Sequence, residues 1–415
     1  MLAIEAEAAS TFDIALSTIK ATNLTEGGKY ANTFVMPNKK GWYMFDAKIR
    51  GGYDKDEDGN DVITASAVAG CLFEKNSGMI TNVGICNNNK SISFYYDGSK
   101  GNASVATFED GGVLWAWYLW CPANEQPEDI VMGSHTYLDR NLGAYNVPTN
   151  EAEVLVMDDV KIFESGGLFF QWGRPSPFPT VTKYEQEAWA SRLGQASNNI
   201  SQKYYYPSAH LITKASYGAA AADSKKVHTF FTCSNQTTWT SAAAATKDPL
   251  MIGCYLNDTS SRYWDTRCGM NVSHADASWN YSNEAHKQYD PCPYGYEVPF
   301  ANDFVADAKT YVEDKTTKIY QATQNGKMYK GGYYFFNGNK MLWNAVVGGR
   351  PHYGLWAHFG SPNTTLIAHS TNTNKNIRIY WGWDESNSKA AIGASAQGTS
   401  NWTQSLALPV RCVKK

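Results

Sequence analysis

The chain has 415 residues, a formal net charge of −3 and only 18% charged residues. This length exceeds the ~250–300 residues at which a single hydrophobic core stops growing, so at least two cores are expected. The weakly acidic balance provides no basic surface for nucleic acid and no polybasic patch for a membrane surface. No apolar run reaches the ~18 residues of a membrane helix, so we do not expect a membrane span.

The composition favours an exported, β-rich protein. The chain contains 26 Tyr and 14 Trp, and Asn, Thr, Ser and Gly are abundant. Such a mixture suits strands with an uncharged polar surface, and the eight Cys fit an oxidising environment. The first ten residues, MLAIEAEAAS, are too acidic to be a signal peptide. We therefore predict an extracellular or cell-surface location, with the export signal not present in this chain.

Residues 28–120 are expected to form a β-sandwich of about seven or eight strands. Short apolar or alternating segments recur there between clusters of Gly, Asn and Asp, which is typical of strands joined by turns. These segments cover residues 29–37, 41–53, 91–98, 102–110 and 112–120. The polar, proline-bearing stretch CPANEQPEDIVMG then marks a domain boundary near 121–132, so the predicted first domain is 1–130. The role of residues 1–27 is left open.

The remaining residues, 131–415, are predicted to form an α+β domain that is also β-rich. Residues 136–145 read as a strand that leads into a turn, and 166–180 as an apolar segment closed by prolines. A long insertion occupies about 181–290. A helix is expected over 300–314, where Phe304, Ala308 and Tyr311 recur at helical spacing. Further strands are expected in the Gly- and Asn-rich stretch from 331 to the end.

The eight cysteines have no C-x-x-C pair and no zinc-ligand spacing, so a structural metal site is not expected. An even number suits disulfides, although eight Cys allow 105 full pairings. Cys292 lies between Pro291 and Pro293, in a segment that cannot run through a helix interior or a central strand. By itself it is either a buried thiol or half of a disulfide. The local pairs Cys71–Cys86 and Cys254–Cys268 are predicted as further disulfides.

Five segments appear in the order found in one known family. They are YLDRNLGA, GLFFQWGRPSPF, YDPCPYGYEVP, YGLWAHFGSP and LPVRCVK. Over about residues 133–415 the chain resembles the FISUMP (major paralogous domain) family. The preceding region resembles the small β-sandwich that often precedes this module. The stretch LWAHFGSP departs from the family, which usually has a simple Trp-Ser-Ser sequence at this point.

The resemblance implies an exported Bacteroidetes-type protein, often a fimbrial-tip or cell-surface module, with a C-type-lectin-like fold. In such a fold the segment before the helix and the last strand lie side by side, so the resemblance also implies a disulfide between Cys292 and Cys412. Pairing these distant cysteines would close the domain, and a bridge of this kind contributes ~2–4 kcal/mol.

The acidic stretch YDKDEDGND places Asp54, Asp56 and Asp58 at alternate positions, as at the opening of a calcium loop. The twelfth position, where a bidentate Glu is expected, is Ala65, which has no side-chain oxygen. The alternative is a solvated acidic hairpin turn. We predict that this turn binds calcium weakly or not at all, and no other cofactor is indicated.

The late loops and strands, residues 345–385, hold a high density of stacking and hydrogen-bonding groups. Sugars are bound by aromatic rings together with polar groups that face the hydroxyls. The alternatives are structural histidines and ordinary strand alternation, in which one aromatic faces the core and the next faces solvent. The predicted ligand-binding residues are Arg350, His352, Trp356, His358, Trp381, Trp383 and Asp384.

No hydrolase, metalloprotease, P-loop or dinucleotide-binding motif is found in the sequence. We therefore predict a non-enzymatic, adhesin-like protein of the cell surface or fimbrial tip whose partner is a glycan or a host surface protein. Two alternatives remain open. One is a structural pilus-assembly subunit that pairs with other pilus subunits by strand addition. The other is a glycan-processing enzyme on the same scaffold, which would need a convergent carboxylate pair.

Overall fold

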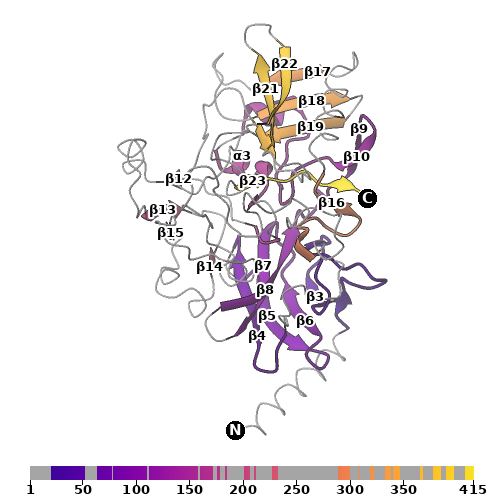
Figure 1. Cartoon of the computed structure of the whole chain (residues 1–415), viewed down its shortest axis with the longest axis vertical. Coiled ribbons are helices and arrows are strands. Elements are labelled where there is room, and N and C mark those ends of the chain that lie inside the picture. Colours follow the sequence, from indigo (N-terminus) through magenta and orange to yellow (C-terminus); the bar gives the residue numbers. More distant parts are fainter. Residues whose placement is uncertain are drawn as a thin grey trace.

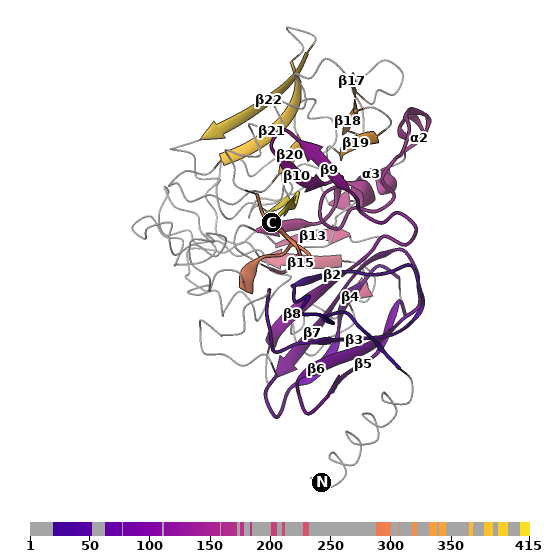
Figure 2. The same cartoon turned by 90° about the vertical axis from the view of Figure 1, so that its right-hand side faces the viewer.

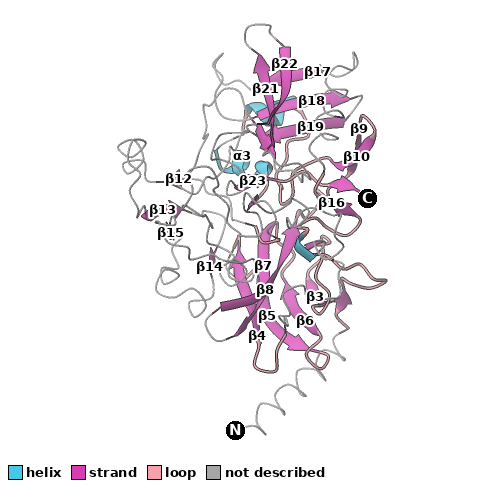
Figure 3. Ribbon diagram, in the orientation of Figure 1, coloured by secondary structure: helices cyan, strands magenta, loops and turns pink. Residues whose placement is uncertain are grey.

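The computed structural model describes the following residues: 20–51, 63–76, 78–109, 112–157, 159–171, 175–177, 183–184, 201–205, 210–211, 227–231, 288–299, 307, 318–321, 332–337, 340–345, 365–367, 377–384, 389–396 and 407–415. The prediction of a β-rich protein is confirmed, because these residues form seven sheets and two short helices. Figure 3 shows that strands dominate the described part of the molecule.

Two sheets are built mainly from the first 121 residues (Figure 1). The first has the order β1 (Thr22–Asn23), β3 (Gly41–Asp46), β6 (Ser91–Tyr96), β5 (Ile80–Cys86). The second has the order β14 (His210–Leu211), β4 (Val68–Glu74), β7 (Gly101–Glu109), β8 (Gly112–Cys121), β2 (Thr33–Val35). Each of the segments expected at 29–37, 41–53, 91–98, 102–110 and 112–120 therefore contains a strand, although β2 and β3 are shorter than the segments that contain them.

The inner faces of these two sheets pack against each other through aromatic side chains. The ring of Phe45 on β3 lies 5.2 Å from that of Trp117 on β8 and 4.8 Å from that of Phe34 on β2. On β3 the burial alternates, so Tyr43 and Phe45 are buried while Trp42 and its outward neighbours are half-buried. This alternation is what a strand needs when one face covers a core and the other faces outward.

Strand β8 is buried on both faces, because the second half of the chain covers the outer side of its sheet. The Trp120 indole Nε1 donates to the Ala144 carbonyl at 3.0 Å, and the Asn102 side chain donates to the Gly143 carbonyl at 2.9 Å. An added Cβ on Gly143 would lie 2.7 Å from the Tyr118 hydroxyl and 2.8 Å from the Leu168 side chain. This close approach, together with a φ of +84°, requires glycine at position 143.

A third sheet joins the two ends of the second half of the chain. Its order is β16 (Tyr296–Glu297), β24 (Val413–Lys414), β10 (His135–Leu138), β9 (Asp129–Met132), and all of its neighbouring pairs are antiparallel. Figure 2 shows β9 and β10 beyond the two sheets of the first half. The strand and turn predicted over 136–145 match β10 and the residues after it. We call these four strands the terminal sheet.

The remaining sheets are small. One pairs β11 (Phe169–Gln171) with β23 (Ala407–Pro409). The other three are β12 (Lys183–Tyr184), β13 (Ser201–Tyr205), β15 (Val227–Phe231); β17 (Lys318–Gln321), β18 (Gly332–Asn337), β19 (Lys340–Ala345); and β20 (Thr365–Ile367), β21 (Ile377–Asp384), β22 (Lys389–Ala396).

The helices are α2 (Glu151–Leu155) and α3 (Asp159–Gly166). Asn150 caps α2, since its side chain accepts from the Glu153 backbone N–H at 3.0 Å. Of the helix predicted over 300–314, Asp307 is helical and the other residues lie outside the described part of the chain.

Candidate functional site

The predicted ligand-binding residues fall into two groups. Arg350, His352, Trp356 and His358 lie outside the described residues, as do the acidic positions Asp54, Asp56 and Asp58. Trp381, Trp383 and Asp384 lie at the end of β21, where the backbone register with β22 is defined.

The register of β21 separates the two tryptophans from the aspartate. Trp381 pairs with Ile392 and Trp383 with Ala390, whereas Asp384 pairs with Lys389. Successive residues of a strand belong to opposite faces of the sheet. Trp381 and Trp383 therefore occupy positions of one face, and Asp384 occupies a position of the other, so the three do not converge on one side of the strand.

The disulfide between Cys292 and Cys412 is confirmed. The two Cα atoms are 6.0 Å apart, and the bridge spans a sequence separation of 120 residues. Both cysteines are buried, at 3% and 0% exposure. Cys292 directly precedes the turn that leads into β16, and Cys412 directly precedes β24, so the bridge joins the segments that enter two neighbouring strands of the terminal sheet.

The predicted pair Cys71–Cys86 is wrong. Cys71 lies on β4 and Cys86 on β5, which belong to different sheets, and both are buried thiols. Burial raises the pKa of the Cys71 thiol well above its usual value, with smaller contributions from Glu74 and Cys121. Cys121 is also a buried thiol, and the predicted pair Cys254–Cys268 lies outside the described residues.

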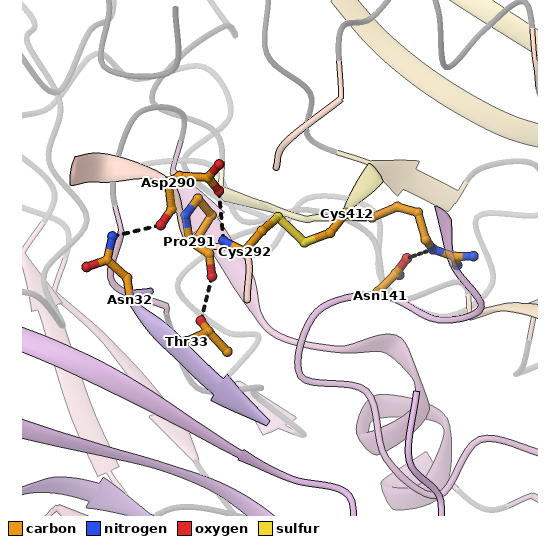
Figure 4. The surroundings of a disulfide bond; sticks show 8 residues. Asn32, Thr33, Asn141, Asp290, Pro291, Cys292 and Cys412 are labelled. Carbon is orange, nitrogen blue, oxygen red and sulfur yellow. Dashed lines mark hydrogen bonds between the residues drawn. A yellow bond between two sulfur atoms is a disulfide. The ribbon is translucent and has the colours of Figure 1, made fainter. Parts of the chain in front are cut away.

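The proline segment around Cys292 lies against the edge of the second sheet (Figure 4). Thr33 on β2 forms a parallel bridge with Pro293, and its hydroxyl donates to the Pro291 carbonyl. The Asn32 amide donates to the carbonyls of Gln288 at 2.6 Å and Asp290 at 2.7 Å. Pro291 and Pro293 have no N–H to donate, and the contacts to the sheet are made instead by carbonyls of this segment that accept side-chain hydrogen bonds.

A second set of buried polar contacts holds the other side of the disulfide. Arg411 is 1% exposed, and its Nε donates to the Asn141 side-chain oxygen at 2.9 Å. The Asn141 amide donates in turn to the Gly166 carbonyl at the end of α3. Figure 4 shows Asn141 on the far side of the disulfide from Asn32 and Thr33. The bridge therefore lies between two buried hydrogen-bond networks: one joins β2 to residues 288–291, and the other joins Arg411 to Asn141 and the end of α3.

A histidine–aspartate pair lies beside the terminal sheet. Asp307 is 3% exposed and accepts from the Tyr137 hydroxyl at 2.7 Å and from the Ser134 backbone N–H at 2.7 Å. The His135 Nδ1 lies 2.6 Å from the same carboxylate. These hydrogen bonds hold Asp307, which has helical backbone conformation, against β10.

The outer face of the terminal sheet carries a group that the sequence did not reveal. The Tyr296 hydroxyl donates to Asp129 Oδ1 at 2.6 Å, and the Lys414 ammonium donates to Asp129 Oδ2. Burial, followed by the hydrogen bond to Asp129, raises the pKa of Tyr296. Tyr294, in the turn before β16, is 55% exposed, and Val131, on β9, is 63% exposed.

Within the described residues no three His, Cys, Asp or Glu side chains group together as metal ligands. None of the helices described is long and apolar enough to cross a membrane. Searches for similar proteins found no matching family model, no matching curated protein and no matching solved structure.

Proposed function

We propose that the protein is an exported, non-enzymatic surface protein that acts as an adhesin and recognises a glycan or a host surface protein. In this proposal the first half is a β-sandwich and the second half a C-type-lectin-like domain of the FISUMP kind, at the cell surface or a fimbrial tip. The motif resemblance described above motivates the assignment.

The observation that supports the proposal best is that the terminal sheet and its disulfide bring the two ends of the second half together. Strand β24 lies between β16 and β10, and the Cys292–Cys412 disulfide joins the segments that lead into β16 and β24. Such a cross-link can hold the two ends of a long recognition segment in place. Fixed ends reduce the conformational entropy that the segment loses when it binds a ligand. The residues predicted to bind, within 345–385, lie inside the disulfide-closed span.

A second candidate function is assembly with other subunits by strand addition. The observation in its favour is that, among the described residues, β14 pairs with β4 at Phe73 and Glu74, at one end of the longer strand Val68–Glu74. A neighbour's strand could extend this pairing along β4. The edge at β2 is less suitable, because the proline segment of the same chain already lies against it.

The adhesin proposal is tested by binding of the oxidised full chain to an array of glycans and to a panel of host-matrix proteins. Affinity from one shallow site should be about millimolar to micromolar, so a multivalent display is needed to detect it. The variant Trp381→Ala/Trp383→Ala should lose binding if the predicted face carries recognition. Unchanged binding by this variant places the site elsewhere, and no binding by the wild type on either panel contradicts the adhesin proposal.

A further inference from the structure

The strongest unassigned surface is the outer face of the terminal sheet, which we call the tyrosine face: Tyr294, Tyr296, Asp129, Val131 and Lys414. Tyr296 pairs with Lys414 on β24, and Tyr294 lies in the turn directly before β16. Thr136 on β10 pairs with Val131 on β9 and, by the antiparallel register of Tyr137 with Val413, lies next to Lys414. One face of the four adjacent strands therefore carries Tyr296, Lys414, Val131 and Asp129.

The backbone that presents Tyr294 is fixed on both sides. Tyr296 N–H donates to the Pro293 carbonyl at 3.0 Å and Gly295 has a φ of +86°, as a type II turn requires at its third residue. Before the turn, Cys292 is held by the disulfide, and its N–H donates to Asp290 Oδ1 at 2.8 Å. After it, the Lys415 N–H donates to the Gly295 carbonyl at 2.9 Å. The tyrosine is therefore presented by a rigid turn.

The same face combines an exposed aromatic ring with an oriented polar group. Tyr294 is 55% exposed, and an added Cβ on Gly295 would meet no atom within 4 Å, so the space over the turn is open. The Asp129 carboxylate accepts from the Tyr296 hydroxyl and from Lys414, which fixes its orientation. The Lys414 side chain is 52% exposed, and its ammonium has three donors.

We propose that the tyrosine face binds an uncharged, hydroxyl-rich glycan; this rests on the proposed adhesin function and names the ligand class and a site for it. A pyranose ring stacks its C–H face on Tyr294, while its hydroxyls donate to Asp129 and accept from Lys414. Asp129 and Lys414 neutralise each other, so the face favours an uncharged sugar over a charged one. Strands of two to four residues offer far less than the ~800 Å² per partner of a stable protein interface, which disfavours a protein ligand.

The test uses the oxidised full chain against an array of neutral and acidic glycans, followed by titration calorimetry with the best neutral oligosaccharide. Tyr294→Ala should weaken binding about tenfold or more, since stacking and its water exclusion are lost. Tyr95→Ala is the matched control, because Tyr95 is a half-buried tyrosine on the outer face of a different sheet and should bind like the wild type. Asp129→Asn, which keeps the side-chain shape, should also weaken binding.

The outcomes separate this inference from the adhesin proposal. If the wild type binds no glycan, the tyrosine-face inference fails, and the adhesin proposal fails as well only if no host-matrix protein is bound either. If the wild type binds but Tyr294→Ala and Asp129→Asn bind equally well, with unchanged melting temperature and intact disulfide, the tyrosine face is not the site and the adhesin proposal stands. A wild type that prefers acidic glycans overturns the ligand class. Weaker binding by both variants, with Tyr95→Ala unchanged, supports the inference.

Discussion

Removing the Cys292–Cys412 disulfide should lower the stability of the protein by several kcal/mol. The bridge closes a loop with a sequence separation of 120 residues. In the chain-entropy model a loop of that length restricts the unfolded state by about 5 kcal/mol at 25 °C, and native disulfides typically contribute about 2–5 kcal/mol. With an unfolding entropy of about 2.1 cal/mol/K per residue, the melting temperature of a chain that unfolds as one unit should fall by about 5 °C.

The assay is differential scanning calorimetry of three samples: the oxidised wild type, the wild type under reductant, and Cys292→Ala/Cys412→Ala. The last two should melt together, below the first. Reduction of Cys71, Cys86 or Cys121 cannot change the melting temperature of the double variant, because these residues are thiols already. A residual shift would report a further disulfide elsewhere in the chain.

Equal melting temperatures for the oxidised wild type and the double variant would refute the chain-entropy reasoning. Peptide mapping under non-reducing conditions provides an independent check. It should recover the Cys292 and Cys412 peptides joined to each other, and their recovery as separate peptides would contradict the bridge itself.

Three further predictions concern the core and the edge of the second sheet. Gly143→Ala should lower the free energy of unfolding, measured by urea titration, by about 3 kcal/mol or more, because its Cβ would lie 2.7 Å from a tyrosine hydroxyl. The control Gly28→Ala has a φ of +81° but no atom within 4 Å of the added Cβ, so it should lower this free energy by only about 1 kcal/mol. Asn32→Ala should cost about 2–4 kcal/mol and speed hydrogen exchange in residues 288–293, since two buried carbonyls lose their donor; unchanged exchange would contradict the edge contact. Burial raises the pKa of both Cys71 and Cys121, so the folded state retains protons that the unfolded state releases. The free energy of unfolding should therefore fall above about pH 8.5, by up to ~1.4 kcal/mol per thiol and pH unit, and a Cys71→Ala/Cys121→Ala variant that declines as steeply would contradict this.

Features that depend on local physics could be predicted from the sequence. The strands around Tyr43, Phe45 and Phe94 follow from alternation, because one face of each strand must cover a core. The stiffness of the segment around Cys292 follows from its prolines, which exclude helix and central strand. The partner of Cys292 needed more than local physics, and the family resemblance supplied it.

Features that depend on distant segments meeting could not be predicted. Cys71 and Cys86 are close in sequence, but β4 and β5 diverge into different sheets, so proximity along the chain was misleading. Tyr296 and Lys414 meet Asp129 across sequence separations of 167 and 285 residues. No periodicity in one sequence encodes such a meeting. The alternation of strand residues between two faces could have separated Asp384 from Trp381 and Trp383. The sequence interpretation grouped these residues because they are close in sequence and did not consider their strand faces.

The most direct test of the central claim is a glycan array probed with the oxidised full chain, displayed multivalently, beside a panel of host-matrix proteins. The adhesin account predicts specific binding to a defined set of glycans or to a matrix protein, saturable and competed by the free ligand. Absence of specific binding on both panels, with the protein folded and the Cys292–Cys412 disulfide intact by mass spectrometry, would contradict it.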